Sequence, residues 1–285
     1  MRAGSRTRAR VRVVEDASAR LRSDQLATEE PLELRLAVAG ETRTLAVTMR
    51  TPGADFELAA GFLRGEDVIS KRDDVVEIRY CTDPDVDPEQ QYNIVTIELR
   101  RDLMPDLRGL ERHFYTSSAC GVCGKATLDS LEIRGCTVIA PGPEIETDVL
   151  YGLPDALRAA QGLFESTGGL HAAGLFDASG ELICVREDVG RHNAVDKLVG
   201  WALLEDRLPL SDHVVMVSGR ASFEIMQKCL TAGVPIVCAV SAPSSLAVSV
   251  AERFGMTLVG FLRGRRFNVY AGAERVKVKE GIASS

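Results

Sequence analysis

The chain has 285 residues, a formal net charge of −7 and 45% hydrophobic residues, which suits one large domain or two ordinary ones. The acidic balance argues against a general nucleic-acid binder, and no apolar run reaches the length of a membrane span or a signal-peptide core. Seven unevenly spaced cysteines argue against a disulfide framework, so we expect a cytoplasmic protein without membrane or nucleic-acid partners.

The first residues are unusually basic. Five arginines and no acid occupy the first twelve positions: Arg2, Arg6, Arg8, Arg10 and Arg12. Such a biased, charged segment cannot bury much apolar surface. We therefore expect residues 1–27 to be a disordered, solvated tail.

Residues 28–110 predict a small α+β domain. Apolar residues alternate over 32–38 and again over 45–49, with a turn at Gly40, which is typical of a hairpin. Asp55 is expected as the N-cap of a helix that runs through Leu63. Strands are expected at 76–80 and 94–99, on either side of a loop rich in Asp and Pro.

Residues 111–285 predict an α/β domain. Short apolar runs typical of buried strands lie at 172–176, 182–185, 214–217, 235–240, 258–261 and 267–270. Helical patterns lie at 127–133, 148–165, 193–204, 223–230 and 246–254. Continuous apolar strands between amphipathic helices indicate a largely parallel sheet with helices on both faces.

The pair Cys120 and Cys123 lies in a run of small residues, followed by Lys125 and a helix-forming stretch. Glycines leave the sulfurs uncovered, and a nearby helix N-terminus and a lysine both favour the thiolate. Three other interpretations of the pair are half of a zinc site, a thioredoxin-like redox motif and two incidental thiols. No second pair exists to complete a zinc site, so we expect no metal.

Polar, glycine-containing segments follow several predicted strands. In open α/β sheets ligands bind beyond the carboxyl ends of strands, where helix N-termini and arginines bind anions. The groups involved are Arg191 and His192, Ser218 and Arg220, Ser241, and Arg263. Ordinary helix capping explains each segment taken alone, but four at one edge favour an anion site. No P-loop or Rossmann fingerprint is present.

Two acids flank these groups and admit two readings. Asp188 and Asp196 orient Arg191 and His192 toward a ligand, or Asp188 caps the helix and His192 is simply exposed. His171, at the start of an apolar strand, is a further candidate.

Over about residues 30–272 the chain resembles the formate dehydrogenase accessory sulfurtransferase family. The resemblance rests on the Cys120–Cys123 pair and on several longer motifs in order. These are Thr167-Gly-Gly-Leu-His171, Glu187-Asp-Val-Gly-Arg191-His192-Asn193-Ala-Val-Asp196-Lys197, Ser218-Gly-Arg220-Ala-Ser222, Ser241-Ala-Pro243-Ser and Phe261-Leu-Arg263-Gly.

The resemblance implies an enzyme that takes persulfide sulfur from a cysteine desulfurase. It would pass the sulfur to the molybdenum of the bis(molybdopterin guanine dinucleotide) cofactor used by formate dehydrogenase. It also implies a homodimer, a cytidine-deaminase-like sheet, and Cys120 as the sulfur carrier with Cys123 beside it. The cofactor is a bound substrate, expected at Phe261, Leu262, Arg263, Gly264, Arg265 and Arg266, with Arg191, His192, Ser218, Arg220 and Ser241 nearby.

Two alternatives remain. A zinc-dependent deaminase needs a His-x-Glu and a Pro-Cys-x-x-Cys motif, whereas Ala119 precedes Cys120 and Ala173 stands two residues after His171. A cofactor-binding chaperone with incidental thiols differs from a sulfurtransferase in one testable respect: it would still work without Cys120.

Overall fold

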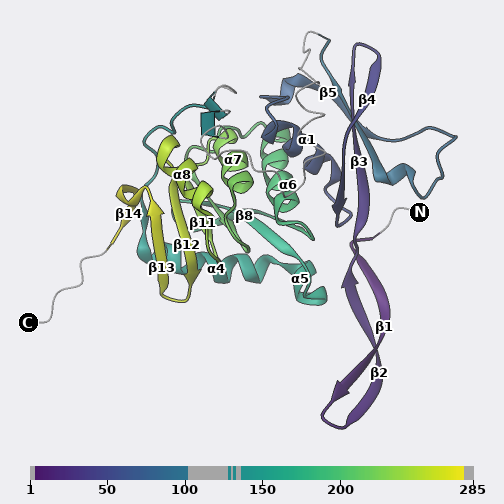
Figure 1. Ribbon diagram of the computed structural model, residues 1–285, viewed down its shortest axis with the longest axis horizontal. Coiled ribbons are helices and arrows are strands. Elements are labelled where there is room, and N and C mark those ends of the chain that lie inside the picture. The colour runs from purple at the N-terminus through teal and green to yellow at the C-terminus, as the bar shows by residue number, and fades with distance from the viewer. Residues whose placement is uncertain (1–3, 102–127, 130, 133–135, 279–285) are drawn as a thin grey trace, which may run out of the picture.

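The computed structural model describes residues 4–101, 128–129, 131–132 and 136–278 (Figure 1). Cys120 and Cys123 lie outside the described residues, as does most of the helix expected at 127–133. No helix in the described part of the chain is both long and apolar enough to cross a bilayer.

The N-terminal unit is a four-stranded sheet with one helix on its inner face. Its elements are β3 (Glu30–Val38), β4 (Glu41–Arg50), α1 (Asp55–Gly65), β5 (Val75–Tyr80) and β6 (Ile94–Leu99), with short 3-10 turns η1 (Arg72–Asp74) and η2 (Gln91–Asn93). The strand order is β4-β3-β6-β5. Alternating Leu32, Leu34 and Leu36 are buried against Leu58 and Leu63 of α1, as the period-two pattern predicts.

One detail of this unit differs from the sequence prediction. The N-cap of α1 is Ala54, and Asp55 is the first helical residue. The Asp55 carboxylate accepts hydrogen bonds from Arg50 Nε at 3.1 Å and from Gly53 N at 3.2 Å. The Asp55 carboxylate, which the sequence predicted as a helix cap, therefore binds the buried Arg50 instead.

The larger unit is built around a six-stranded sheet of order β13-β12-β11-β10-β8-β9. Its strands are β8 (His171–Asp177), β9 (Leu182–Asp188), β10 (His213–Val217), β11 (Ile236–Ala239), β12 (Thr257–Arg263) and β13 (Arg266–Ala271). Its helices are α4 (Thr147–Ala160), α5 (Gly162–Thr167), α6 (Arg191–Leu204), α7 (Phe223–Thr231) and α8 (Ser245–Phe254), and the 3-10 turn η3 (Ala273–Arg275) follows β13. A small parallel pair, β7 (Ile145–Glu146) with β14 (Val276–Lys277), lies beside it.

The prediction of a largely parallel sheet is wrong. Only β10–β11 and β11–β12 are parallel, whereas β8–β9, β8–β10 and β12–β13 are antiparallel. Short turns close β8–β9 and β12–β13 into hairpins, which forces antiparallel pairing. The fold is therefore a mixed α/β sheet. Its cytidine-deaminase-like character stays a prediction.

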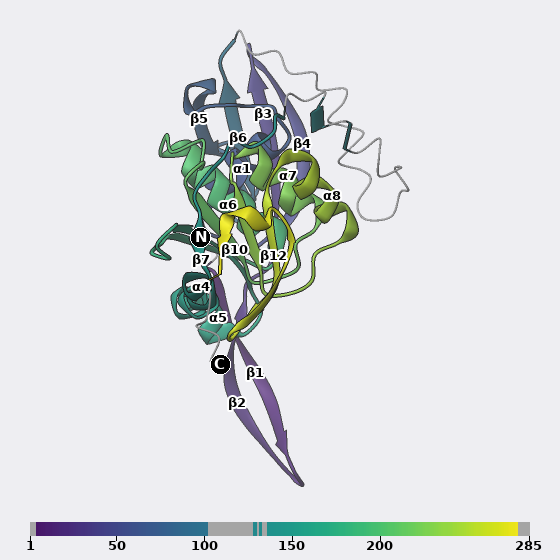
Figure 2. The same cartoon turned by 90° about the vertical axis from the view of Figure 1, so that its left-hand side faces the viewer.

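Helices cover both faces of this sheet, as predicted (Figures 1 and 2). Leu150, Leu153 and Leu157 of α4 pack on one face against Val214 and Met216. The other face carries α6, α7 and α8, which bury the alternate strand residues, including Val215, Val217, Val237 and Ala239. Alternation within each buried strand thus supplies two separate cores.

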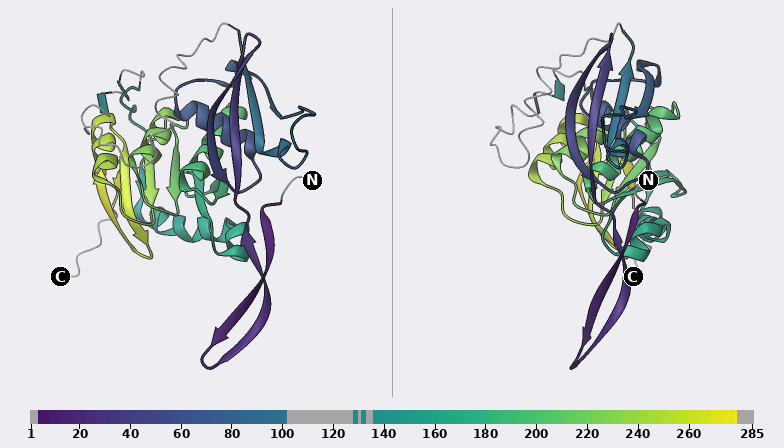
Figure 3. Two further views of the ribbon diagram at one scale, coloured as in Figure 1. Left: turned by 45° about the vertical axis from the view of Figure 1, so that its right-hand side comes forward. Right: turned by 90° about the vertical axis from the view of Figure 1, so that its right-hand side faces the viewer.

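Residues 6–27 form a hairpin, so the prediction of a disordered tail is wrong over this range. Strands β1 (Arg6–Glu15) and β2 (Ser18–Ala27) pair along their whole length and extend away from both sheets (Figures 1 and 3). Asp16 closes the turn with a φ of 52°. Arginines at every second position alternate with Ala9, Val11 and Val13, a strand period that an argument from composition overlooks.

The two units meet where α1 crosses α6. A Cβ on Gly61 would lie 1.8 Å from the Asp196 carbonyl oxygen, and one on Gly200 would lie 1.8 Å from the Glu57 carbonyl oxygen. Both atoms belong to backbone, so no side-chain rotation relieves the clash. Two glycines therefore set the distance between the helices.

We expect Gly61→Ala to lower the free energy of unfolding by about 2 kcal/mol or more, because overpacking outweighs the gain of about 1 kcal/mol in helix propensity. The matched control is Gly152→Ala in α4, where a Cβ meets nothing within 4 Å. That change should leave stability unchanged or raise it by up to about 1 kcal/mol. Urea unfolding followed by circular dichroism measures both, and equal stability of the two variants would contradict the close crossing.

Candidate functional site

The predicted polar segments converge at the end of the six-stranded sheet where most of its strands finish, here called the strand-end edge. β9, β10, β11 and β12 all end there, and β8, which runs the opposite way, begins there. His171 consequently stands opposite Asp188 in the strand register. The topology thus brings together segments that are far apart in the chain; His171 and Arg263, for example, are separated by 92 positions.

Gly219 forms the middle of this edge. A Cβ on Gly219 would lie 3.4 Å from His171 Nδ1 and 3.6 Å from Arg191 Cδ, so both side chains lie beside its backbone. Ser218 Oγ accepts a hydrogen bond from Ala172 N at 2.9 Å and holds β8 against the end of β10. Burial, together with the positive charge of Arg191, lowers the pKa of His171, so this imidazole is neutral at pH 7.

Arg191 retains an unused donor. Its Nε is buried and has no hydrogen-bond partner among the described residues. A buried, unsatisfied guanidinium N–H is costly, and an anion bound at the edge would satisfy it. Arg191 is therefore a candidate for binding an anion at this edge.

His192 follows Arg191 in the first turn of α6 and contacts the start of α7. Its Nε2 lies 3.1 Å from Ser222 Oγ and 2.8 Å from Glu224 Oε2. The hydrogen bond with His192 lowers the pKa of Glu224. Sequence reasoning missed Glu224, and its only signal was its place in the first turn after the cap Ser222. A cavity of about 260 Å³ between α1, α6 and α7 is lined by His192, Glu224 and Lys228 among others.

The end of β12 adds a strained backbone. Phe261 has a φ of 54°, in the left-handed region that non-glycine residues rarely adopt. Its N–H donates to the Ser241 carbonyl at 3.1 Å, and Ser241 N donates to the Gly219 carbonyl at 3.4 Å. The Arg263 guanidinium lies 6.0 Å from the centre of the Phe261 ring. Such strain, of order 1–3 kcal/mol, is often found at functional sites.

The expected cofactor residues divide into two groups. Arg191, His192, Ser218, Arg220, Ser241, Phe261 and Arg263 all lie at or directly after the strand ends of this edge. The side chain of Leu262 is fully buried in the core with residues of α4, so it is not available to a ligand. Arg265 pairs with Asp148 at 3.2 Å. Gly264 forms the turn with a φ of 54°, and Arg266 is exposed at the start of β13.

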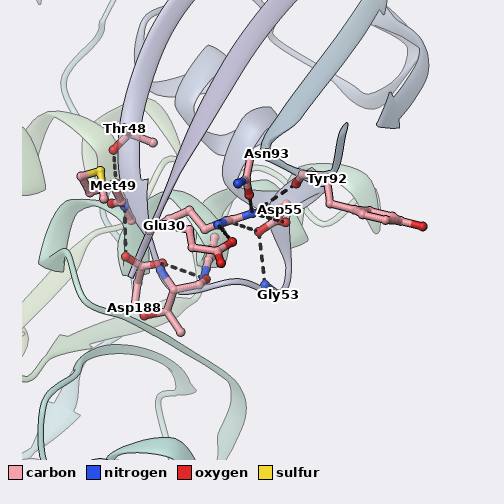
Figure 4. Close-up of polar contacts among 12 residues, drawn as sticks. Glu30, Thr48, Met49, Gly53, Asp55, Tyr92, Asn93 and Asp188 are labelled. Carbon is pink, nitrogen blue, oxygen red and sulfur yellow. Dashed lines mark hydrogen bonds and ion pairs between the residues drawn. The ribbon is translucent and has the colours of Figure 1, made fainter. Parts of the chain in front are cut away.

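Asp188 acts on the site through the backbone. It is fully buried and accepts hydrogen bonds from Thr51 N at 3.1 Å and Gly190 N at 2.9 Å, with Lys197 Nζ 2.7 Å away. Figure 4 shows it beside the end of β4, below Met49 and Thr48. The N-cap of α6 is Gly190, so Asp188 is not the cap that one reading expected.

Asp196 also forms a buried ion pair. Its Oδ1 lies 2.6 Å from Lys228 Nζ, and both residues are buried. In the described part of the chain, no hydrogen bond joins Asp188 or Asp196 to the side chain of Arg191 or His192. The two acids therefore position α6 rather than orient those side chains directly.

The described cysteines are poor nucleophiles where they are buried. Burial raises the pKa of Cys184 to about 11 and that of Cys229 to about 12, and it raises the pKa of Cys238 as well. Cys81 and Cys136 are partly exposed. Among the described residues, no three His, Cys, Asp or Glu side chains gather as a metal site, a search that does not reach Cys120 or Cys123.

The FdhD/NarQ family model matches residues 27–277. The chain belongs to the FdhD/NarQ family. A relative from Streptomyces coelicolor named "Sulfur carrier protein FdhD" is 52% identical and covers 94% of this chain and 95% of its own length. A relative of the same name from Sulfurisphaera tokodaii is 44% identical, with 94% and 98% covered.

A solved structure shares the fold of this FdhD/NarQ family member. It is described as a putative formate dehydrogenase accessory protein from Desulfotalea psychrophila. The TM-score is 0.72 and the identity 25%, and the match covers 95% of this chain and 99% of that one. The expected family is therefore confirmed.

Lys197→Met should lower the free energy of unfolding by about 3–5 kcal/mol, because it leaves the Asp188 carboxylate buried without its cation. The control is Arg43→Met, which breaks an exposed pair with Glu41 at 3.4 Å and should cost about 0–1 kcal/mol. Urea unfolding midpoints compare the two. Similar small losses would show that Asp188 does not depend on Lys197.

Proposed function

We propose that this protein is a sulfur carrier for formate dehydrogenase that holds sulfur as a persulfide on Cys120, with Cys123 beside it. The observation that carries the proposal is the near-full-length match to relatives named sulfur carrier protein FdhD. The raised pKa values of the buried Cys184, Cys229 and Cys238 thiols support it, because they argue against these three cysteines as the carrier.

The loading step needs no external oxidant. The Cys120 thiolate attacks the terminal sulfur of a persulfide on a cysteine desulfurase, forming a new S–S bond while the old S–S bond breaks. The desulfurase cysteine leaves as a thiolate, and Cys120 becomes the persulfide. Attack by Cys123 on Cys120 would then release the outer sulfur as sulfide and leave a disulfide, with both electrons coming from the two thiols. A dithiol reductant restores the pair, which suits the reducing cytoplasm we expect.

The acceptor in this proposal is the molybdenum of the bis(molybdopterin guanine dinucleotide) cofactor, which is substrate rather than resident cofactor. Its phosphates suit the strand-end edge, since Arg191 keeps a buried unpaired Nε and Arg220 and Arg263 are exposed there. Ser218, Ser241 and the strained Phe261 supply backbone and hydroxyl groups at the same edge. Formate dehydrogenase would receive the sulfurated cofactor. A homodimer is part of the same expectation.

Incubation with an active cysteine desulfurase and cysteine, without reductant, should add one sulfur atom to the peptide that contains Cys120. Intact-protein and peptide mass spectrometry measure this directly. Cys120→Ala should abolish the added sulfur, and formate dehydrogenase matured with that variant should be inactive. Cys81→Ala, which removes a partly exposed thiol far along the chain, should change neither result.

Retention of formate dehydrogenase activity with Cys120→Ala would contradict the carrier role and favour a cofactor-binding chaperone. Addition of sulfur only to Cys123 would reassign the carrier within the pair. Loss of the added sulfur with Cys81→Ala would instead place the reactive thiol in the N-terminal unit.

The strand-end edge can be tested separately with guanosine diphosphate, the nucleotide portion of the cofactor. Arg191→Ala should weaken its binding at least about tenfold, because a charge-assisted hydrogen bond to phosphate is worth about 1.5–3 kcal/mol. Arg207→Ala is the control, because Arg207 follows the end of α6 and its guanidinium lies over the Trp201 ring. Isothermal titration calorimetry at fixed salt measures both, and equal affinities would exclude Arg191 from the nucleotide site.

A further inference from the structure

A cavity that the proposed function does not use lies where the two units meet. It has a volume of about 210 Å³ and is lined by Arg64 from the last turn of α1, by Thr231 at the end of α7 and by Cys136. The α7 helix begins after Ser222, so roughly 13 Å of helix separates this cavity from the strand-end edge. None of the described residues expected to bind the cofactor lines it.

Arg64 brings a positive charge and one unused donor to this cavity. Its Nη2 donates to the Thr231 carbonyl, and its Nη1 lies 3.4 Å from Asp67 Oδ1. Its Nε is buried and has no hydrogen-bond partner among the described residues. A buried N–H of a charged group is costly when it stays unsatisfied, so this donor favours an anionic acceptor in the cavity.

The Cys136 thiol shares the cavity with this guanidinium. Cys136 is partly exposed, and its N–H donates to the Leu131 carbonyl at 3.0 Å. Burial lowers the pKa of Arg64, whereas the negative charges of Asp67 and of a Cys136 thiolate oppose that shift, so Cys136 and Arg64 lie within electrostatic reach of each other. An arginine beside a cysteine favours the thiolate, which is the nucleophilic form.

Cys81, the other partly exposed thiol of the described chain, provides a contrast. It also lies within electrostatic reach of an arginine, Arg35. The Arg35 Nε and Nη2 donate to the Glu33 carboxylate at 2.8 and 3.2 Å, so an anion already occupies that guanidinium. Among the described cysteines, Cys136 is therefore the one that combines access with an unused arginine donor.

We propose that Cys136 is a second persulfide site of this protein, in which the Arg64 Nε donates to the outer sulfur. The inference rests on the proposed function in one respect, which is that sulfur reaches the protein as a persulfide. The Cys136 thiolate attacks the outer sulfur of a donor persulfide, so that one S–S bond forms, one breaks, and the donor cysteine leaves as a thiolate. No net oxidation occurs. The deprotonated outer sulfur carries the negative charge that Arg64 stabilises.

Sulfur at Cys136 is protected from the reaction that releases it at Cys120. In the proposed function Cys123 stands three positions from Cys120 and displaces its outer sulfur as sulfide, whereas Cys136 is 13 positions beyond Cys123. The cavity has room for the added sulfur atom, since a water molecule needs only about 10–15 Å³ of such volume. An outer sulfur enclosed there is less open to attack by another thiol, so the site stores sulfur that the pair would lose.

The first test uses a small-molecule donor, cysteine persulfide, so that it does not depend on loading at Cys120. In the C120A/C123A chain, mass spectrometry should find one added sulfur on the tryptic peptide of residues 135–158, which holds Cys136 and no other cysteine. R64M in the same chain should lower this occupancy at least about tenfold, the factor expected for a charge-assisted hydrogen bond. R35M, the matched change beside Cys81, should leave it unchanged.

Absence of sulfur on this peptide, or equal occupancy with and without R64M, overturns the proposal. The desulfurase experiment on the wild-type chain separates the second site from the carrier role, because Cys120 and Cys123 lie on a different tryptic peptide, residues 113–125. Sulfur at Cys120 with none at Cys136 overturns the second site alone. Sulfur at Cys136 with none on residues 113–125 overturns the carrier role alone.

A measurement on the wild-type chain covers the case in which R64M disturbs folding. Iodoacetate carries a carboxylate and iodoacetamide is its neutral counterpart, so the ratio of their alkylation rates reports an anion-binding group beside a thiol. This ratio should be at least about fivefold higher at Cys136 than at Cys81, because an unused arginine donor is available at Cys136. A ratio at Cys136 equal to or below that at Cys81 would overturn the role of Arg64.

Discussion

The Asp188 carboxylate is the contact on which the arrangement of the two units and the site depends. It ends β9, binds the backbone of Thr51 in the N-terminal unit and that of Gly190 at the start of α6, and pairs with Lys197. A buried carboxylate is tolerated only when its charge and lone pairs are satisfied. Because all these partners must be in place together, α6 begins at a fixed position, and Arg191 begins with it.

The contact between α1 and α6 completes that constraint. With no Cβ on Gly61 or Gly200, the two helices approach until their backbones touch. Arg186 of β9 also pairs with Glu57 of α1, with Nη2 to Oε1 at 2.8 Å. The small N-terminal unit is therefore part of the support of the strand-end edge, since moving α1 would move α6 and the residues at its first turn.

The strand-end edge is suited to an anion for reasons of electrostatics and geometry together. Burial and neighbouring positive charge keep His171 neutral, whereas Arg191 stays charged with one donor unused. The His192 imidazole contacts the Glu224 carboxylate through Nε2. The edge thus combines fixed donors with limited freedom, and such preorganised groups lose little on binding a ligand. The thiols in our proposal belong to a different part of the chain.

The sequence by itself determined the types and approximate limits of most elements, the two helix-covered faces, and the family, because local periodicity and motif order are written in consecutive residues. It also named most residues of the edge, since polar segments after buried strands mark strand ends. Only the tertiary structure decided that the sheet is mixed, because apolar runs carry no strand direction. It alone showed that Asp188 and Asp196 brace α6, that Leu262 is core, that Glu224 contacts His192, and that residues 6–27 pair as a hairpin. These depend on contacts between residues far apart in the chain, which no local pattern records.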